Sequence, residues 1–147
     1  VWNPPEKIED LHEPLQNNIK AWEAGKSYAF TITEKEAGKP LGRISIRKTN
    51  KANRWNVGFW THPESQKQGI MTEAFRGVLK FGFEELAATE IEACHALWNK
   101  ASEKVLKRNG MIFEQYIAEG FQKNGQWVEE NLLVINKELW NKILSHT

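Results

Sequence analysis

A glycine-containing turn at residues 66–71 is the segment whose residue types and spacing could do chemistry. An apolar, strand-like run precedes it at residues 55–61, and apolar side chains recur at helical spacing over residues 75–86. The first N–H groups of a helix lack acceptors within the helix and carry a partial positive charge, so such a turn can hold a phosphate. An ordinary strand-to-helix turn would explain these residues equally well. The turn consists of Gln66, Lys67, Gln68, Gly69, Ile70 and Met71.

The composition narrows the class of protein. With 147 residues the chain can form one domain with a sizeable core, which we expect to span residues 1–147. The net charge is +1, from 20 basic and 19 acidic residues spread along the chain, which argues against a nucleic-acid-binding protein. Cys94 is the one cysteine, so an intramolecular disulfide and a cysteine-based zinc site are excluded, and we expect no metal.

Hydropathy gives no sign of a membrane partner. No apolar run approaches the ~18 residues that a membrane-spanning helix needs, and no charged-then-apolar leader opens the chain. A reduced, cytoplasmic setting fits the single cysteine.

The elements that must position the turn follow from periodicity and from turn residues. Asn99 is a suitable N-cap and Gly110 a suitable stop for one helix, and Asn124-Gly125 is the strongest short hairpin signal in the sequence. In chain order we predict a helix over 6–22 interrupted at Pro14, strands over 27–33, 41–48 and 55–61, a helix opening at Thr72, a strand over 90–97, the helix that Asn99 begins, strands over 112–121 and 127–136, and a helix over 136–145.

These elements predict an α/β fold. Strands that start antiparallel and then cross over through a helix give a mixed, mostly antiparallel sheet, here of about six strands, with helices on both faces. The strands over 55–61 and 90–97 are joined by a helical crossover, so they should run parallel.

Several motifs in a fixed order resemble the Gcn5-related N-acetyltransferase (GNAT) superfamily. The resemblance covers roughly residues 28–140 and is closest to the branch that acetylates the N-termini of ribosomal proteins. It implies acetyl-CoA as co-substrate, with the turn holding the pyrophosphate and the two parallel strands splaying apart around the pantetheine. The motifs are His62-Pro63-Glu64, the turn followed by Thr72-Glu73-Ala74, Asn99-Lys100-Ala101-Ser102, and Leu106 to Gly110-Met111.

The same resemblance implies roles for individual residues. Asn99 would hydrogen-bond the pantetheine, and Ser102 would lie near the thioester sulfur and protonate the leaving thiolate. A hydroxyl that bonds back within its own helix is the alternative for Ser102. The implied cofactor-binding residues are Phe59, Trp60, Thr61, Gln66, Lys67, Gln68, Gly69, Ile70, Met71, Thr72, Asn99 and Ser102.

The chain departs from the family pattern at three places. Met71 stands where the family usually has glycine or alanine, so we expect weaker binding of acetyl-CoA. Leu106 stands where many relatives have a tyrosine, which leaves Ser102 as the candidate proton donor. We expect no counterpart of the family's usual first strand and helix in residues 1–147, either through truncation or because the strand comes from elsewhere, and an exposed sheet edge would then favour a homo-oligomer.

A proton acceptor for the amine is less well defined by the sequence. Glu92 and Glu129 are our candidate catalytic carboxylates beside Ser102, with His62 and His95 as alternatives. Cys94 and His95 are adjacent in a strand, so their side chains should point to opposite faces. We therefore expect direct attack of the amine on the thioester, without an acetyl-enzyme.

The function that these observations favour is transfer of an acetyl group from acetyl-CoA to a primary amine. The acceptor could be a peptide N-terminus or a small amine such as a polyamine or an aminoglycoside-like antibiotic. Two alternatives belong to other classes: a non-catalytic acyl-CoA-binding module, and an interaction domain without a CoA site.

Overall fold

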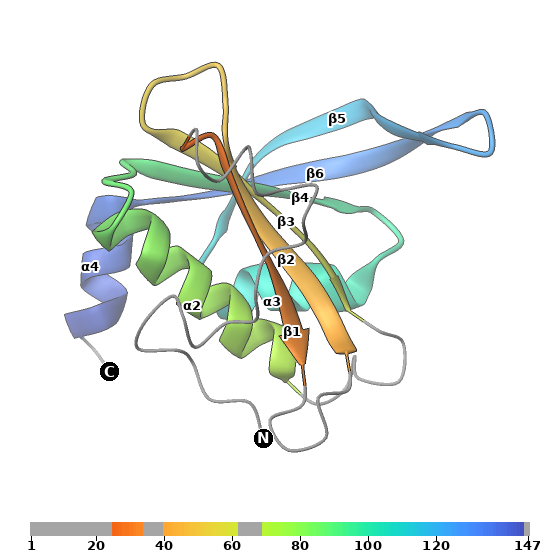
Figure 1. The fold of residues 1–147 in the computed structure, drawn as a ribbon. Coiled ribbons are helices and arrows are strands. Elements are labelled where there is room, and N and C mark those ends of the chain that lie inside the picture. The colour runs from red at the N-terminus through yellow and green to blue at the C-terminus, as the bar shows by residue number, and fades with distance from the viewer. Residues whose placement is uncertain (1–24, 34–39, 62–68, 146–147) are drawn as a thin grey trace.

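The computed structural model describes residues 25–33, 40–61 and 69–145 as six strands and three helices (Figure 1). The helix predicted over 6–22 lies outside the described residues. In chain order the elements are β1 (Ser27–Thr33), β2 (Pro40–Lys48), β3 (Arg54–Thr61), α2 (Ile70–Glu84), β4 (Glu90–Ala96), α3 (Lys100–Arg108), β5 (Ile112–Lys123), β6 (Gln126–Asn136) and α4 (Lys137–Ser145).

The six strands form one mixed sheet in the order β1-β2-β3-β4-β6-β5. Within the described residues β3 and β4 are the one parallel pair, as the helical crossover predicts. Their pairing is short, because it joins only residues 54–56 to residues 90–92. Residues 57–61 and 93–96 no longer pair with each other, so the two strands splay apart and leave a split in the sheet. The predicted α/β class, the mixed sheet of six strands and the splayed pair are confirmed. Helices on both faces are not seen among the described residues, whose three helices share one face.

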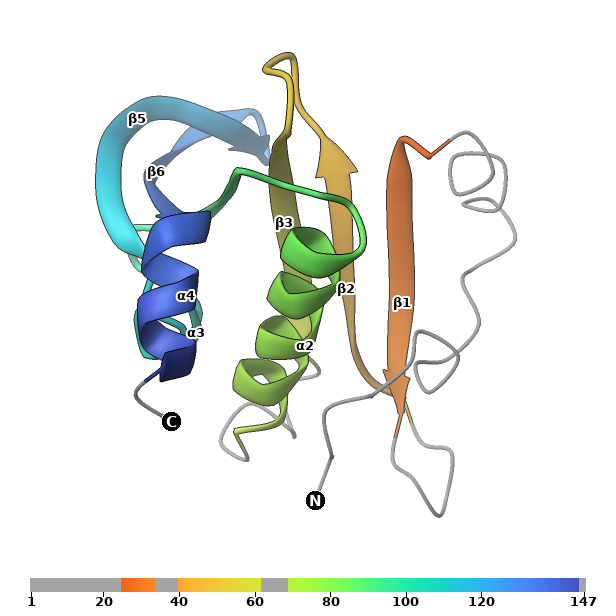
Figure 2. The same cartoon turned by 90° about the vertical axis from the view of Figure 1, so that its left-hand side faces the viewer.

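The three described helices pack on one face of the sheet, and Figure 2 shows α2 and α4 in front of it. Gly82 brings α2 onto the strands, because a Cβ there would lie 2.7 Å from Ile91 Cδ1 and 2.9 Å from Ile46 Cδ1. Trp140 of α4 stacks on Phe83 of α2 at a ring separation of 5.6 Å. The layer between helices and sheet is the core, with Phe30, Ile32, Ile44, Ile46, Phe75, Leu79, Phe83, Ile91, Leu106, Leu133 and Ile135 fully buried.

Local signals explain most element boundaries. Asn99 caps α3, since its Oδ1 accepts the N–H of Ser102 at 3.1 Å. Gly110 follows that helix with φ +83, the left-handed conformation that glycine adopts at no steric cost. Asn124 and Gly125 have φ of 54° and 78°, which fits a two-residue hairpin turn between β5 and β6. The predicted start of α2 is wrong by two residues, because the helix begins at Ile70 rather than at Thr72.

The β5–β6 hairpin projects from the body of the sheet (Figure 1). Its outer strand β5 is an edge, and two register shifts against β6 bend it. None of the described helices is long and apolar enough to cross a membrane.

Candidate active site

A cavity of about 80 Å³ lies where the end of β3 meets the first turns of α2 and α3. It therefore lies beside the part of β3 that has separated from β4. Six of the predicted cofactor-binding residues come together here from three separate segments of the chain. The lining residues are Phe59, Trp60, Thr61, Met71, Asn99, Ala101, Ser102 and Val105.

The remaining predicted cofactor-binding residues belong to the turn before α2. Gly69 is the N-cap of α2 and has φ +69, and no side chain caps this end of the helix. Ile70, Met71 and Thr72 form the first turn, whose N–H groups have no acceptor within the helix. Gln66, Lys67 and Gln68 lie outside the described residues. Contact between any of these residues and acetyl-CoA stays a prediction.

Asn99 and Ser102 lie together at the start of α3. The cap uses only the amide oxygen of Asn99, and an asparagine side chain keeps two further N–H donors for a ligand carbonyl. Ser102 lines the cavity, and among the described residues its hydroxyl makes no hydrogen bond back to its helix. Ser102 is therefore placed to act on a group in the cavity.

Met71 is part of the cavity wall rather than of a loop. Its side chain is only 4% exposed, because α2 starts earlier than predicted and turns Met71 into the core. The Met71 Cε atom lies 3.2 Å from the position of a Cβ on Gly42. The expected weakening of acetyl-CoA binding by Met71 stays a prediction.

Gly42→Ala is expected to disturb this wall, because the added Cβ would lie 2.4 Å from the backbone oxygen of Trp60. Gly42 pairs with Thr61, so β2 and β3 would have to separate beside the cavity. We expect a loss of roughly 1–3 kcal/mol in the free energy of unfolding, measured by urea denaturation. The matched control is Gly58→Ala, where the nearest side-chain atoms are 3.9 and 4.0 Å away. Equal stability of the two variants would contradict this account.

The predicted carboxylates do not line this cavity. Both oxygens of Glu92 are occupied, Oε1 by Arg54 Nε at 2.7 Å and Oε2 by Asn56 Nδ2 at 2.8 Å. Glu92 lines a different cavity, of about 440 Å³. Glu129 is exposed and accepts a hydrogen bond from the hydroxyl of Tyr116, which raises the pKa of that tyrosine. A catalytic role for Glu92 or Glu129 stays a prediction.

Of the two alternative histidines, His95 lies within the part of the chain that the structure describes. His62 lies outside the described residues. His95 is 3% exposed, with its Nδ1 2.8 Å from the carbonyl oxygen of Ala96 and its Nε2 3.9 Å from Glu103 Oε2. His95 therefore sits beneath α3, on the helix-covered face.

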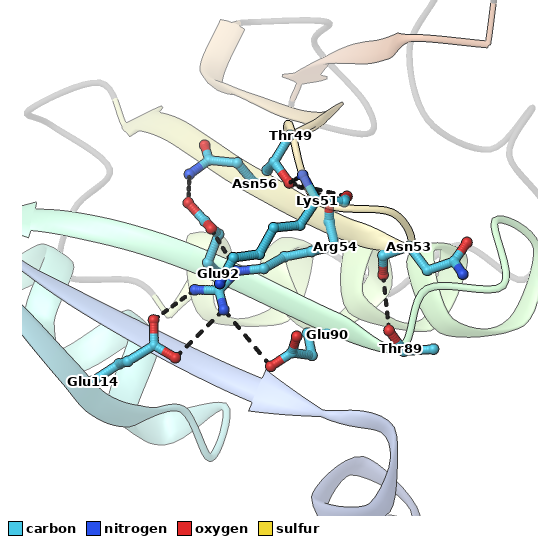
Figure 3. Close-up of polar contacts among 9 residues, drawn as sticks. All are labelled: Thr49, Lys51, Asn53, Arg54, Asn56, Thr89, Glu90, Glu92 and Glu114. Carbon is cyan, nitrogen blue, oxygen red and sulfur yellow. Dashed lines mark hydrogen bonds and ion pairs between the residues drawn. The ribbon is translucent and has the colours of Figure 1, made fainter.

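A buried arginine organises the closed end of the split (Figure 3). Arg54 is the first residue of β3, and its guanidinium bonds Glu92 at 2.7 Å and Glu114 Oε2 at 2.6 Å. Glu90 lies 3.6 Å away. The hydrogen bond to Arg54 lowers the pKa of Glu114, and the hydrogen bond to Glu114 is the largest cause that raises the pKa of Arg54. The sequence analysis did not identify this network, because its partners are 36 to 60 residues apart.

The surroundings of Cys94 disfavour its thiolate form. Burial raises its pKa to about 12, and the nearby Glu130 and Glu92 carboxylates act in the same direction. The thiolate is the nucleophilic form of cysteine, so Cys94 carries very little of it near neutral pH. Strand alternation points Cys94 away from the buried His95. These observations favour direct attack over an acetyl-cysteine intermediate.

A split mixed sheet, with two helices that begin beside the split, places the chain among the α/β domains. The chain belongs to the GNAT acetyltransferase family, whose acetyltransferase (GNAT) domain model matches residues 1–112. The resemblance seen in the sequence is therefore confirmed at the level of the family.

Individual relatives agree with this assignment. The chain is 33% identical over 89 residues, 60% of its length, to YdaF of Bacillus subtilis (strain 168), named a putative ribosomal N-acetyltransferase. It spans about half of YdaF, 49% of the relative's length. Among solved structures, a ribosomal-protein-S5-alanine acetyltransferase from Vibrio fischeri has a TM-score of 0.79 at 21% identity, over 95% of this chain and 80% of that one. Mycobacterium smegmatis RimJ, solved with a CoA-disulfide, has a TM-score of 0.77 at 22% identity, over 88% and 65%. At these identities the two structures show the shared fold.

Proposed function

We propose that this chain transfers the acetyl group of acetyl-CoA to a primary amine by direct attack of the amine on the thioester. The observation that carries the proposal is the cavity at the split, where Met71, Asn99 and Ser102 converge from the starts of two helices. Membership of the GNAT family supports the same reaction. The raised pKa of Cys94 supports a mechanism without an acetyl-enzyme.

The roles that we propose follow from this arrangement. The first turn of α2 binds the pyrophosphate through backbone N–H groups, and Asn99 donates to a carbonyl of the pantetheine. Ser102 gives a proton to the departing thiolate. Positioning of the two reactants supplies most of the rate, because it can be worth on the order of 7–11 kcal/mol.

A protein N-terminal α-amine is the acceptor that we favour. The support is the naming of relatives: one is a ribosomal-protein-S5-alanine acetyltransferase and another is described as a ribosomal N-acetyltransferase. Such substrates and acetyl-CoA meet in the cytoplasm, which is therefore the compartment that we propose. We further propose that residues 1–147 act as one domain, and that the exposed strand β5 supports association of copies. Sedimentation as a strict monomer would count against association.

Binding of acetyl-CoA is the first expected result. At 100 times its Kd the ligand should add about 2.7 kcal/mol to the free energy of unfolding, measured as a rise in melting temperature. CoA should give a similar rise, whereas S-acetylpantetheine, which lacks the pyrophosphate, should give a much smaller one. Absence of any shift would remove both the catalytic proposal and a CoA-binding role.

Turnover is tested separately with three acceptors. A pentapeptide with a free alanine α-amine should release CoA thiol, and the same peptide with an acetylated N-terminus should not. Spermidine tests the small-amine alternative. Saturable acetyl-CoA binding without turnover of either amine would contradict the transferase proposal and leave a binding module.

A further inference from the structure

We propose that the carboxylate of Glu130 on β6 accepts the proton of the attacking amine, on the sheet face opposite the helices. The inference rests on the proposed function and names a catalytic residue for it. It also replaces Glu92 and Glu129, the two carboxylates that the sequence suggested, by a neighbour that the sequence analysis did not select. Its basis is the position of Glu130 relative to the split, together with the lack of a hydrogen-bond or ion-pair partner for Glu130 among the described residues.

The helix-covered face is already assigned to the cofactor, because α2 and α3 begin on that side and line the cavity there. An amine that attacks a thioester in the split must then approach from the other face. The register places Glu130 on that face: Glu130 pairs with Ala96 of β4, two residues along from Cys94. Pairing of β4 with β3 has ended at Glu92, so Glu130 lies beside the part of β4 that borders the split, one strand away from the split itself.

Three small residues lie on this face beside the split, and Trp60 of β3 lies on it at the end of the strand. Gly58 of β3 and Cys94 and Ala96 of β4 lie on it by strand alternation. A Cβ on Gly58 would have no atom nearer than 3.9 Å. The side chains at these three positions are therefore too small to block an acceptor amine that approaches the split between the two strands.

Glu130 differs from the other carboxylates of this region in what it contacts. Glu92 and Glu114 are bonded to Arg54, and Glu129 is bonded to Tyr116. Glu130 is half-buried, and its carboxylate makes no hydrogen bond or ion pair with any residue that the structure describes. Its oxygens are free to accept a proton from a bound amine.

Gly120 of β5 provides the space that the Glu130 carboxylate occupies. A Cβ on Gly120 would lie 2.3 Å from Glu130 Oε1 and 2.7 Å from its Cδ, closer than any real contact. This glycine sits in the irregular stretch of β5 where the register against β6 shifts between Ile117 and Phe121. The Glu130 carboxylate therefore lies against the backbone of Gly120.

Burial gives this carboxylate the affinity for protons that a base needs. The pKa of Glu130 is raised by burial, and His95, on the far side of β4, opposes this to a smaller extent. Cys94 is the other titratable group near it on β4, whereas β5 presents Ile117 and Gly120, which do not titrate. A base works best when its pKa approaches the working pH, so the shift is in the useful direction.

Each proton that leaves the acceptor nitrogen can be assigned to a group already named. Glu130 takes one proton from the ammonium form of the acceptor and later releases it to solvent. The neutral amine nitrogen then attacks the carbonyl carbon, the N–C bond forms and the C–S bond breaks. The second proton leaves the nitrogen and, through Ser102 or water, ends on the departing thiolate. The products are the acetylated amine, CoA thiol and one proton.

The test is the pH profile of kcat/KM with acetyl-CoA and the free-amine pentapeptide. Glu130→Gln is expected to lower kcat/KM by about 10²–10⁴-fold and to remove the acidic limb of the profile. The melting-temperature rise with acetyl-CoA should be unchanged. Glu119→Gln is the matched control, since it makes the same charge change on an exposed residue beside Gly120. Gly120→Ala should also lower kcat/KM, because its Cβ displaces the carboxylate without removing it.

Stability separates a catalytic loss from unfolding. The folded-state pKa of Glu130 is raised, so its ionisation costs stability as the pH rises through that pKa. Glu130→Gln should therefore be at least as stable as the wild type at neutral pH. A variant that is stable, binds acetyl-CoA and keeps the acidic limb would overturn the inference, as would loss of the limb in Glu129→Gln alone. A wild type that binds acetyl-CoA but acetylates neither amine would overturn the proposed function, and this inference with it.

Discussion

Replacement of Arg54 by methionine is expected to lower the free energy of unfolding by about 3 kcal/mol. The side chain of Arg54 is 5% exposed and that of Glu92 is 18% exposed, so the substitution leaves a poorly hydrated carboxylate without its cation. Breaking a buried ion pair on one side typically costs 3–5 kcal/mol, and we take the low end because Glu114 and Glu90 keep contact with water. Methionine preserves the length and much of the packing of the side chain.

Urea denaturation at neutral pH measures the effect of Arg54→Met. Arg43→Met on the exposed side of β2 is the matched control, and it should change stability by no more than about 0.5 kcal/mol. Adding Glu114→Gln to the Arg54 variant should recover part of the loss, since one of the unpaired charges is then removed. Similar midpoints for Arg54→Met and Arg43→Met would show that the network contributes no stability.

The difference in free energy of unfolding between the wild type and Arg54→Met should change with pH in a definite direction. The pKa of Glu114 is lowered in the folded protein by its bond to Arg54. A depressed carboxyl pKa contributes stability above the unfolded value of about 4.3 and loses it as the pH falls through the folded value. The stability gap between wild type and Arg54→Met should therefore narrow under acidic conditions. A gap that widened in acid would contradict the ion-pair account.

The Arg54 network also bears on the site. Only three residue pairs join β3 to β4, and Arg54 belongs to the first of them. Its bonds reach across to β4 through Glu92 and on to β5 through Glu114. They therefore reinforce the closed end of a split whose other end must stay open for ligands. We expect Arg54→Met to weaken acetyl-CoA binding as well as stability.

The sequence predicted the strands, the hairpin and α3 because each depends on neighbouring residues. Period-two alternation, the Asn124-Gly125 turn and the Asn99 cap are all short-range signals. The predicted start of α2 is two residues late because the glycine-containing motif assigns Ile70 and Met71 to the loop, whereas a left-handed Gly69 already ends the turn. Apolar residues directly after such a glycine are equally compatible with the first turn of a helix.

Short-range sequence signals could not predict the ion-pair network of Arg54 or the position of the Glu130 carboxylate. Which acid pairs with Arg54, and which is left unpaired, depends on strand register between segments far apart in the chain. Glu129 and Glu130 are adjacent in sequence, yet one bonds Tyr116 and the other lies over Gly120. Strand alternation points them to opposite faces, and the register of β5 against β6 sets which residues of β5 each one meets.

Ser102→Ala is expected to lower kcat for acetyl transfer by about 10²-fold and to leave measurable turnover. Ser102 lines the cavity, and a positioned proton donor contributes roughly 10²–10⁴-fold. The low end applies because water can protonate a thiolate in its place. The KM for acetyl-CoA should hardly change, since Asn99 caps the backbone N–H of residue 102, which the substitution keeps.

Steady-state kinetics with the free-amine pentapeptide separate this role from a structural one. Ser102→Thr keeps a hydroxyl and should restore most of kcat, whereas Ser102→Ala should not. An unchanged kcat in Ser102→Ala would remove Ser102 from the mechanism and leave protonation to solvent. Loss of Ser102 and loss of Glu130 act on different protons, so Ser102→Ala should keep the acidic limb that depends on Glu130. A double variant whose loss equals the product of the two single losses would support this division of labour.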